Sequence, residues 1–170
     1  ASGTALGNHE YGYICGGDSD STGTVISSIY KITYAVDDVT EMPSSSMTIQ
    51  NESGQNCMRY FSFGNGTHGY VCGGESANSK AVNKLTYATD TTSFAPDLWG
   101  VARMAEAVSS NTAGYISGLY NTSWGGYKMP YSTETWTQGP GLTLATQRHW
   151  CAGFNAGMNG NAFTDTPNVI

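Results

Sequence analysis

The chain has 170 residues, a length that suits one domain, or two small ones, with a sizeable buried core. Only 12% of the residues are charged, whereas glycine contributes 22 residues and tyrosine 11. Low charge combined with many aromatic residues argues against intrinsic disorder. The composition therefore favours a glycine- and tyrosine-rich all-β protein.

The charge balance limits the partners of the chain. It has 13 acidic and 7 basic residues, a net charge of −6, so it lacks the basic footprint of a nucleic-acid-binding protein. No apolar run approaches the ~18–20 residues of a membrane span. No signal-peptide pattern is visible, although a start at Ala1 is also compatible with a leader that has been removed. We expect no nucleic-acid partner and no membrane span.

Internal repeats organise nearly the whole chain. The segment GYICGG at 12–17 recurs as GYVCGG at 69–74 and as GYISGL at 114–119. A second segment follows each of these, as KITYAVDDVTEMP at 31–43, KLTYATDTTSFAP at 84–96 and KMPYSTETWTQGP at 128–140. An arginine opens each following unit, at Arg59, Arg103 and Arg148. The markers predict units at about 1–58, 59–102 and 103–147, then a partial fourth at 148–163 and a tail at 164–170.

The second repeated segment carries the same residue types at the same positions. These positions are Lys31/Lys84/Lys128, Tyr34/Tyr87/Tyr131, Asp37/Asp90/Glu134 and Pro43/Pro96/Pro140. The first unit is longer than the others. We place its surplus in two surface-loop insertions, at 18–25 and 44–56.

The expected secondary structure is all strand. Residues 25–34 alternate loosely with period two and fit a half-buried strand. Residues 101–110 and 113–120 flank the turn-like Asn111-Thr112, and 126–133 and 142–148 follow as short strands. A helix at 101–110 is disfavoured because the equivalent segment RYFSFGNG of the preceding unit is no helix former.

A period near 45 with Gly-Gly, Tyr, Trp, Pro and Arg markers resembles the Kelch repeat of β-propellers. The third unit matches best, with Arg103, Tyr131 and Trp136 where that family places its Arg, Tyr and Trp. Two departures are Gly118-Leu119 in place of Gly-Gly, and Val39 and Thr92 at the Trp position. Over residues 10–155 the units look even more like the degenerate Kelch-like arrays of large bacteriophage virion proteins, those of cyanophages especially.

The resemblance implies four-stranded blades around an axis. Glycine pairs are then expected on the innermost strand, aromatic residues between blades and prolines in the outer connecting loops. Propellers typically close with about four to eight blades, and this chain has three units and part of a fourth. Three resolutions stay open: the N-terminal strand before His9 completes a C-terminal blade, several chains join, or the chain is a segment of a longer protein.

Cysteine and histidine suggest structure rather than chemistry. Cys15 and Cys72 share one repeat position, where the third unit has Ser117, so we predict unpaired structural thiols there. The sequence does not indicate whether Cys57 and Cys151 form a disulfide bond. No zinc-type cysteine spacing occurs. The histidines, His9, His68 and His149, are expected in turns or at the surface.

One insertion resembles half of a calcium loop. Asp18, Asp20 and Thr22 precede Gly23 with alternate-position spacing, but Ile29 stands where the closing glutamate is expected. Calcium at this loop is a candidate, and an acidic surface turn is the alternative. No other cofactor is expected.

Surface recognition has a second set of candidates. Trp99, Trp124 and Trp150 lie outside the repeated Trp position, so they are candidate ligand or partner contacts, with Asn121 beside Trp124. Packing is the alternative role for these tryptophans. Sequons make Asn51, Asn65 and Asn121 candidate glycosylation sites if the protein passes through a glycosylating secretory system.

No catalytic Ser-His-Asp order, nucleotide-binding glycine motif or persuasive pair of acids emerges. The resemblance implies a non-enzymatic structural or assembly protein of an extracellular particle, best a phage virion component such as a tail fibre or decoration protein. Its partners would be copies of itself or other structural subunits. The alternative is a carbohydrate-binding lectin with sites on inter-blade loops, and a glycan-degrading enzyme is a weaker third hypothesis.

Overall fold

A computed structural model of the chain describes residues 3–18, 25–44, 49–50, 60–73, 80–98, 100, 105–117 and 126–139. Every regular element in these ranges is a β-strand, and the strands form three antiparallel sheets of four. The prediction of an all-β protein built from four-stranded units is confirmed. Residues 25–34, predicted as a strand, contain Val25–Thr33, the longest strand among the described residues.

Each sheet is a simple meander in which consecutive strands pair. The first sheet contains β1 (Thr4–Gly7), β2 (Tyr11–Asp18), β3 (Val25–Thr33) and β4 (Asp38–Glu41). The second contains β5 (Phe61–Gly64), β6 (His68–Cys72), β7 (Val82–Thr86) and β8 (Thr91–Ala95). The third contains β9 (Glu106–Ser109), β10 (Ala113–Ser117), β11 (Gly126–Pro130) and β12 (Thr137–Gly139).

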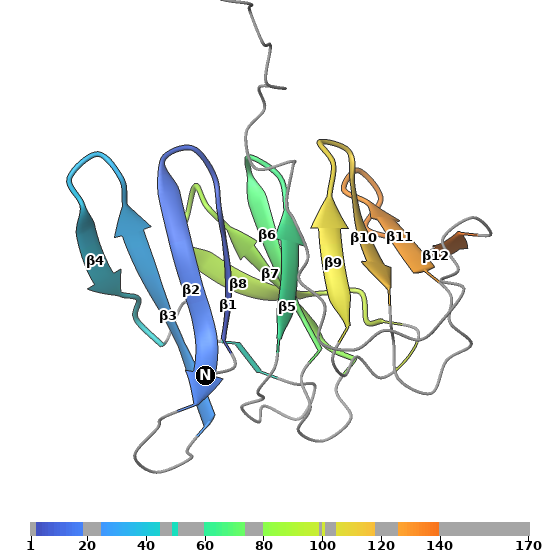
Figure 1. The fold of residues 1–170 in the computed structure, drawn as a ribbon, viewed down its shortest axis with the longest axis horizontal. Helices are drawn as coiled ribbons and strands as arrows, with labels where there is room; N and C mark the ends of the chain where they lie inside the picture. Colours follow the sequence, from blue (N-terminus) through green and yellow to red (C-terminus); the bar gives the residue numbers. More distant parts are fainter. Residues whose placement is uncertain are drawn as a thin grey trace, which may run out of the picture.

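The three sheets stand side by side like blades. The first strands β1, β5 and β9 lie at the centre, where β1 contacts β5 and β5 contacts β9, and the later strands fan outward (Figure 1). The buried core lies between the sheets rather than inside one of them. One cluster, around Tyr13 and Val71, joins the first sheet to the second, and another, around Phe63 and Met129, joins the second to the third.

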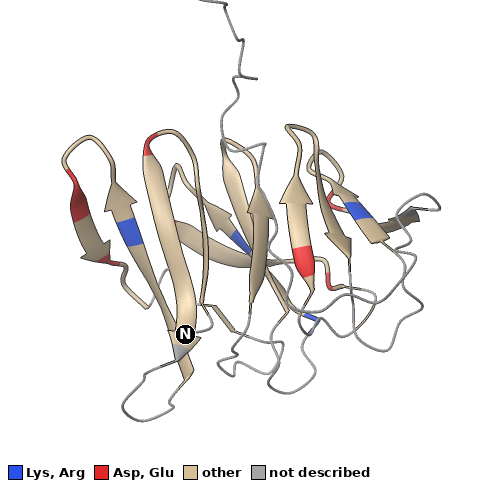
Figure 2. Ribbon diagram, viewed as in Figure 1, with Lys and Arg blue, Asp and Glu red and all other residues tan. Residues whose placement is uncertain are grey.

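The same cross-strand pair recurs in every sheet. Tyr13 pairs with Lys31, Tyr70 with Lys84 and Tyr115 with Lys128 in the register of the second and third strands. Figure 2 shows the lysines as one blue band on each of β3, β7 and β11. Because side chains opposite each other in a register share a face of the sheet, each pair lies on the equivalent face of its sheet.

A polar side chain also closes the first hairpin of each sheet. The Asn8 Oδ1 atom accepts from the Tyr11 backbone N–H at 2.8 Å, Asn65 Oδ1 from that of His68 at 2.9 Å, and Ser110 Oγ from that of Ala113 at 3.1 Å. Side chains of this kind stabilise turns by replacing a backbone acceptor. This role in the turn is sufficient to account for an asparagine at position 65, and glycosylation of Asn65 stays a prediction.

The glycine pair was expected on the innermost strand, but the structure places it at the C-terminal end of the second strand. Gly16 and Gly73 occupy this position with φ of 63° and 73°, conformations that side-chain-bearing residues rarely adopt. In the first sheet the register shifts between Cys15 and Gly17. The glycines are therefore needed for a positive-φ turn, with a bulge in the first sheet, and Gly16 is also needed for close approach, because a Cβ atom added there would lie 2.5 Å from the Tyr60 ring.

Two further features bear on the expectations from the sequence. The N-terminal strand β1 pairs with β2 and forms an edge of the first sheet, and the C-terminal residues that it was considered to join lie outside the described ranges. The insertion at 18–25 is not wholly a loop, because Asp18 pairs with Val25 at the ends of β2 and β3. Pro43 and Pro96 do follow the last strands of their sheets, as expected for outer connections.

Candidate functional site

The most elaborate arrangement of side chains in the described residues lies where neighbouring sheets meet. We call the contact between the first and second sheets the first junction and that between the second and third sheets the second junction. Both are built from repeat positions, and both use the same three contacts: a shared carboxylate, a buried tyrosine and a glycine covered by an apolar side chain.

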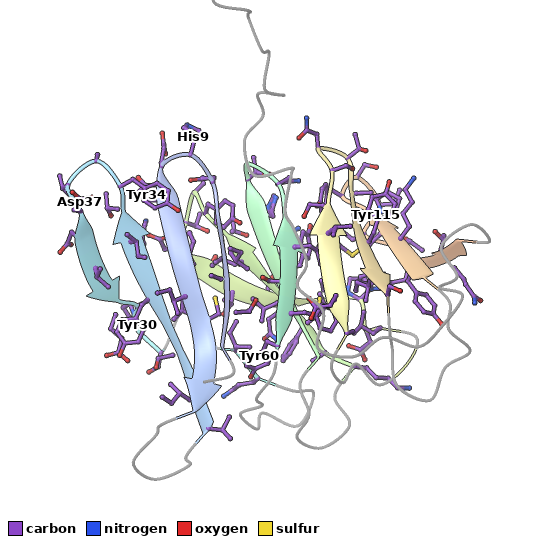
Figure 3. The ribbon with its side chains drawn as sticks, in the orientation of Figure 1. His9, Tyr30, Tyr34, Asp37, Tyr60 and Tyr115 are labelled. Carbon is purple, nitrogen blue, oxygen red and sulfur yellow. The ribbon has the colours of Figure 1, made fainter. Side chains whose placement is uncertain are left out.

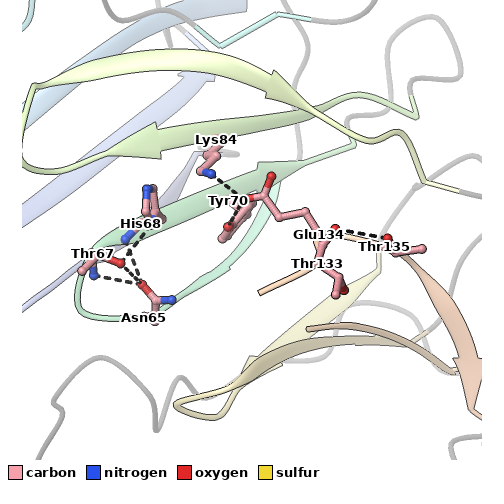
Figure 4. A network of polar contacts seen from close by, with 8 residues as sticks. All are labelled: Asn65, Thr67, His68, Tyr70, Lys84, Thr133, Glu134 and Thr135. Atoms are coloured by element: carbon pink, nitrogen blue, oxygen red, sulfur yellow. Dashed lines mark hydrogen bonds and ion pairs between the residues drawn. The ribbon is translucent and has the colours of Figure 1, made fainter. Parts of the chain in front are cut away.

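The carboxylate contact links a turn of one sheet to the Tyr–Lys pair of the sheet before it. In the first junction, Tyr13 Oη donates to Asp90 Oδ1 at 2.8 Å and Lys31 Nζ donates to Asp90 Oδ2 at 2.6 Å. In the second, Tyr70 Oη donates to Glu134 Oε1 at 2.8 Å, and Lys84 Nζ donates to the same oxygen (Figure 4).

The acid of each unit has an unusual backbone conformation. Asp37, Asp90 and Glu134 have φ of 50°, 51° and 50°, and they are the non-glycine residues with positive φ in the described ranges. This left-handed conformation costs a side-chain-bearing residue about 1 kcal/mol or more. Its occurrence at one position in all three sheets indicates that the turn geometry that presents the acid is part of the repeat.

The electrostatics of the junction follow from this geometry. Burial first, and then the hydrogen bond to a carboxylate, raise the pKa values of Tyr13 and Tyr70 far above that of free tyrosine, so both remain donors. Burial would raise the pKa of Glu134, but the hydrogen bonds from Lys84 and Tyr70 outweigh it and lower this pKa. The second junction therefore holds the charged Glu134 carboxylate between a phenol and an ammonium group.

In the second and third units, a second tyrosine reaches back to the inner strand of the preceding sheet. Tyr87 Oη donates to the Gly7 carbonyl at 3.3 Å, and its ring stacks on Tyr13 with centroids 5.2 Å apart. Tyr131 Oη donates to the Gly64 carbonyl at 2.8 Å, and its ring stacks on Tyr70 at 5.7 Å. Tyr87 is buried and Tyr131 is partly buried, so each ring contributes apolar area and also satisfies a backbone acceptor.

The third contact needs a glycine. Leu6 of β1 lies over Gly69, and Phe63 of β5 lies over Gly114. A Cβ atom added at Gly69 would lie 2.4 Å from Leu6, and one added at Gly114 would lie 2.1 Å from the Phe63 ring. The Gly-Tyr dipeptide of the repeat is thus explained: the glycine receives the side chain of the preceding sheet, and the tyrosine extends to the following one.

Trp136 strengthens the second junction alone. Its Nε1 donates to the Pro96 carbonyl at 2.9 Å, and its ring packs edge-on against Phe63 at 5.8 Å. The first junction has Thr92 at the equivalent position. The position that resembles the Trp of the Kelch repeat is therefore used for packing between sheets.

A small pocket opens among the inner strands. It has a volume of about 280 Å³ and is lined by residues of β1, β5 and β9 or next to them, including Ser62 and Glu106. The Ser62 hydroxyl donates to the Ala5 carbonyl at 2.9 Å. Glu106 is the one acid among the described lining residues, so these residues supply no pair of carboxyl groups for glycoside hydrolysis.

Most of the predicted site residues lie outside the described ranges. These are Asp20 and Thr22 of the calcium candidate, Trp99, Trp124, Trp150 and Asn121 of the contact set, and the sequon residue Asn51. Asp18 ends β2. No group of three His, Cys, Asp or Glu residues within the described part of the chain is arranged to hold a metal ion. Calcium binding and the lectin alternative stay predictions.

The predicted structural thiols are present. Cys15 and Cys72 are free and buried, and burial raises the pKa of Cys15 to about 12 and that of Cys72 well above its usual range. A thiol that stays protonated at neutral pH is a poor nucleophile and a poor metal ligand. Cys57 and Cys151 lie outside the described residues.

The junctions themselves were not predicted from the sequence. The repeat alignment identifies Lys31, Lys84 and Lys128 as equivalent, but it does not say that a lysine of one unit meets the acid of the next. The available signal was the recurrence of three polar or aromatic types, Lys, Tyr and Asp/Glu, at fixed spacing. When residue types that are seldom buried recur at the same spacing in every unit, they are expected to pair with one another.

No protein-family model matches this chain, and no curated protein matches it either. Within the described residues there is no helix long and apolar enough to cross a membrane.

Proposed function

We propose that the protein is a non-enzymatic structural protein whose Kelch-like propeller blades assemble into an extracellular particle. The role that fits best is that of a phage virion component such as a tail fibre or decoration protein. The resemblance of the repeats to phage arrays supports the particle, and the junctions support the assembly role. A repeated contact between sheets, made from positions present in all three units, is the property of a module that adds to itself.

The observation that carries the proposal is the state of the two outermost faces. The first sheet has no described sheet before it, and the third has none after it. Both nevertheless carry the residues that the junctions use. Exposed contact residues at both ends favour association with further subunits.

The assembly role is tested by the mass of the purified chain in solution. We expect sedimentation analysis at micromolar concentration to show species larger than the 18.0 kDa chain. A stable monomer at all concentrations would count heavily against assembly.

The particle is tested separately. We expect mass spectrometry of purified phage particles whose genome encodes this sequence to detect the protein in amounts comparable to other structural subunits. Its presence in the cell lysate and absence from washed particles would contradict a virion role.

A further inference from the structure

The two outermost faces of the described sheets are the two halves of one more junction. We define the leading face as Gly12, Ile14, Tyr34 and Asp37 of the first sheet. We define the trailing face as Val108, Tyr115, Lys128 and the backbone carbonyl of Ser109 in the third sheet; the Ser109 side chain itself faces the second junction, where its Oγ accepts from the Gly64 N–H at 3.0 Å. Figure 3 shows Tyr34 and Asp37 at the β3–β4 hairpin at one end of the fan, and Tyr115 at the other end.

The trailing face has the donors of a junction. Tyr115 and Lys128 pair across β10 and β11 as Tyr13 and Lys31 pair across β2 and β3. The Lys128 Nζ atom lies 5.8 Å from the centre of the Tyr115 ring, the same distance that separates Lys31 Nζ from the Tyr13 ring. No carboxylate partner of Lys128 occurs among the described residues.

The leading face has the matching acid. Asp37 is exposed and has the same left-handed conformation as Asp90 and Glu134, the acids of the two formed junctions. The turn is thus already arranged to present a carboxylate, although the described structure places no Tyr–Lys pair before it. A positive half-site at one end and a negative half-site at the other are complementary in charge.

The remaining contacts match as well. Tyr34 is 49% exposed, whereas its equivalent Tyr87 is 4% exposed because it reaches the inner strand of the preceding sheet. Val108 is 44% exposed, whereas its equivalent Phe63 is fully buried over Gly114.

We propose that a second copy of this chain docks head to tail, with its leading face on the trailing face of the first. In this junction Tyr115 and Lys128 donate to Asp37 of the other copy. Tyr34 of that copy donates to the Ser109 carbonyl, and Val108 covers Gly12. The inference rests on the assembly role proposed above, and it names the partner and the residues.

The geometry of this contact is heterologous, because different faces of the two copies meet. Such contacts either close into a ring or extend as a filament. Two chains that closed on each other would place six described sheets around one axis, within the range of about four to eight blades typical of propellers.

Charge reversal tests the pairing. Asp37→Lys and Lys128→Glu are each expected to raise the dissociation constant of the assembly at least about tenfold, since each places like charges in the new junction. An equimolar mixture of the two variants should assemble again. In the mixture, the introduced lysine meets the introduced glutamate, and the native Asp37 of one chain meets the native Lys128 of the other.

The control is Asp38→Lys, which changes charge equally at the next residue. Asp38 accepts from Thr40 within its own hairpin, so this variant should assemble like the wild type. Because lysine tolerates the left-handed conformation at position 37 poorly, Asp37→Asn provides a second variant, and it should weaken assembly less than Asp37→Lys. Circular dichroism verifies that every variant is folded.

The outcomes separate this inference from the proposed function. If the wild type assembles and neither charge reversal weakens its assembly, head-to-tail docking is overturned but an assembly role remains. The same holds if the two variants weaken assembly and mixing them does not restore it. A monomeric wild type whose own thermal stability falls in Lys128→Glu shows that another segment of the same chain fills the trailing face, and it also overturns the inference. The virion role is decided independently by the composition of the particles.

Discussion

The first and second sheets carry nearly the same residues in different surroundings. Ile14 of β2 is 46% exposed, whereas Val71, at the same position of β6, is fully buried against the first sheet. The two positions differ little in side-chain chemistry. Burial in this molecule is therefore decided by the presence of a neighbouring sheet, and the repeat encodes a contact rather than a closed core.

The comparison also separates local from long-range structure. The turn that holds Asp37 forms with the same backbone geometry as the turn of Asp90, although only Asp90 meets a Tyr–Lys pair in the described structure. The hairpin must therefore specify the left-handed residue by itself. Matched substitutions in the formed junctions and on the leading face of the unassembled chain should separate the stability that comes from the turn itself from the stability that comes from contact between sheets.

The largest expected difference concerns the glycines that receive an apolar side chain. Gly114→Ala forces a Cβ atom into the buried Phe63 ring, and we expect a loss of about 2–3 kcal/mol in the free energy of unfolding. Gly12→Ala meets only the hydroxyl end of the exposed Tyr34, which can move away, so we expect a change within about 1 kcal/mol. Urea denaturation of both variants measures the difference, and equal losses would contradict this account.

The next largest change in the free energy of unfolding is expected at the shared carboxylate. Glu134→Gln leaves Lys84 and Tyr70 without their charged acceptor, and we expect a loss of about 1–2 kcal/mol. Asp37→Asn on the leading face should change the stability of the monomer by less than about 0.5 kcal/mol. The pair is compared by urea denaturation at a concentration where no assembly occurs. A loss at Asp37 as large as that at Glu134 would show that the leading face is already occupied.

Acid should weaken the second junction. Because the folded-state pKa of Glu134 is lowered, its contribution is complete above the ordinary glutamate pKa of about 4.3 and is lost as the pH falls through the folded value. The pKa of His68 is also lowered, by burial and then by the charge of Lys84, against the opposing charge of Glu134. Its contribution is present above about pH 6.5 and is lost below it in the same way.

We therefore expect the free energy of unfolding to fall as the pH is lowered from 7 to 3. Urea midpoints at several pH values measure this dependence. In Glu134→Gln the part of the fall below about pH 4.5 should be smaller than in the wild type. An unchanged dependence in this variant would show that Glu134 does not contribute to it.

The sequence predicted the units but not the way they meet. Repeat spacing identifies equivalent residues, and this was sufficient for three all-β units and for the buried thiols at Cys15 and Cys72. The partners across a junction are 59 residues apart for Lys31 and Asp90, and 77 for Tyr13 and Asp90. Periodicity says nothing about which face of one unit contacts which turn of the next, because that depends on strand register and on the order of the sheets.

The glycine pair shows the same limit in another form. Its recurrence predicts a backbone requirement, and glycine satisfies two quite different ones: close approach and positive φ. In this chain Gly69 and Gly114 of the Gly-Tyr dipeptides serve close approach, Gly73 adopts positive φ, and Gly16 does both, because it also lies against the Tyr60 ring. Sequence alone does not distinguish these uses, since both remove the Cβ atom.

The smallest expected effect concerns the position that Cys15 and Cys72 share with Ser117. The two thiols are fully buried and need no strong hydrogen bond, whereas the Ser117 hydroxyl is buried without a partner in the part of the chain that the structure describes. A buried polar atom without a partner reduces stability, so Ser117→Cys, which restores the residue of the other two units, should raise the free energy of unfolding by up to about 1 kcal/mol. The matched change Cys72→Ser should lower it, because it buries a hydroxyl in the apolar second junction. Urea denaturation under reducing conditions compares the two variants. A loss of stability in Ser117→Cys would mean that the hydroxyl has a partner beyond the described residues, and that the third sheet differs from the others at its trailing face.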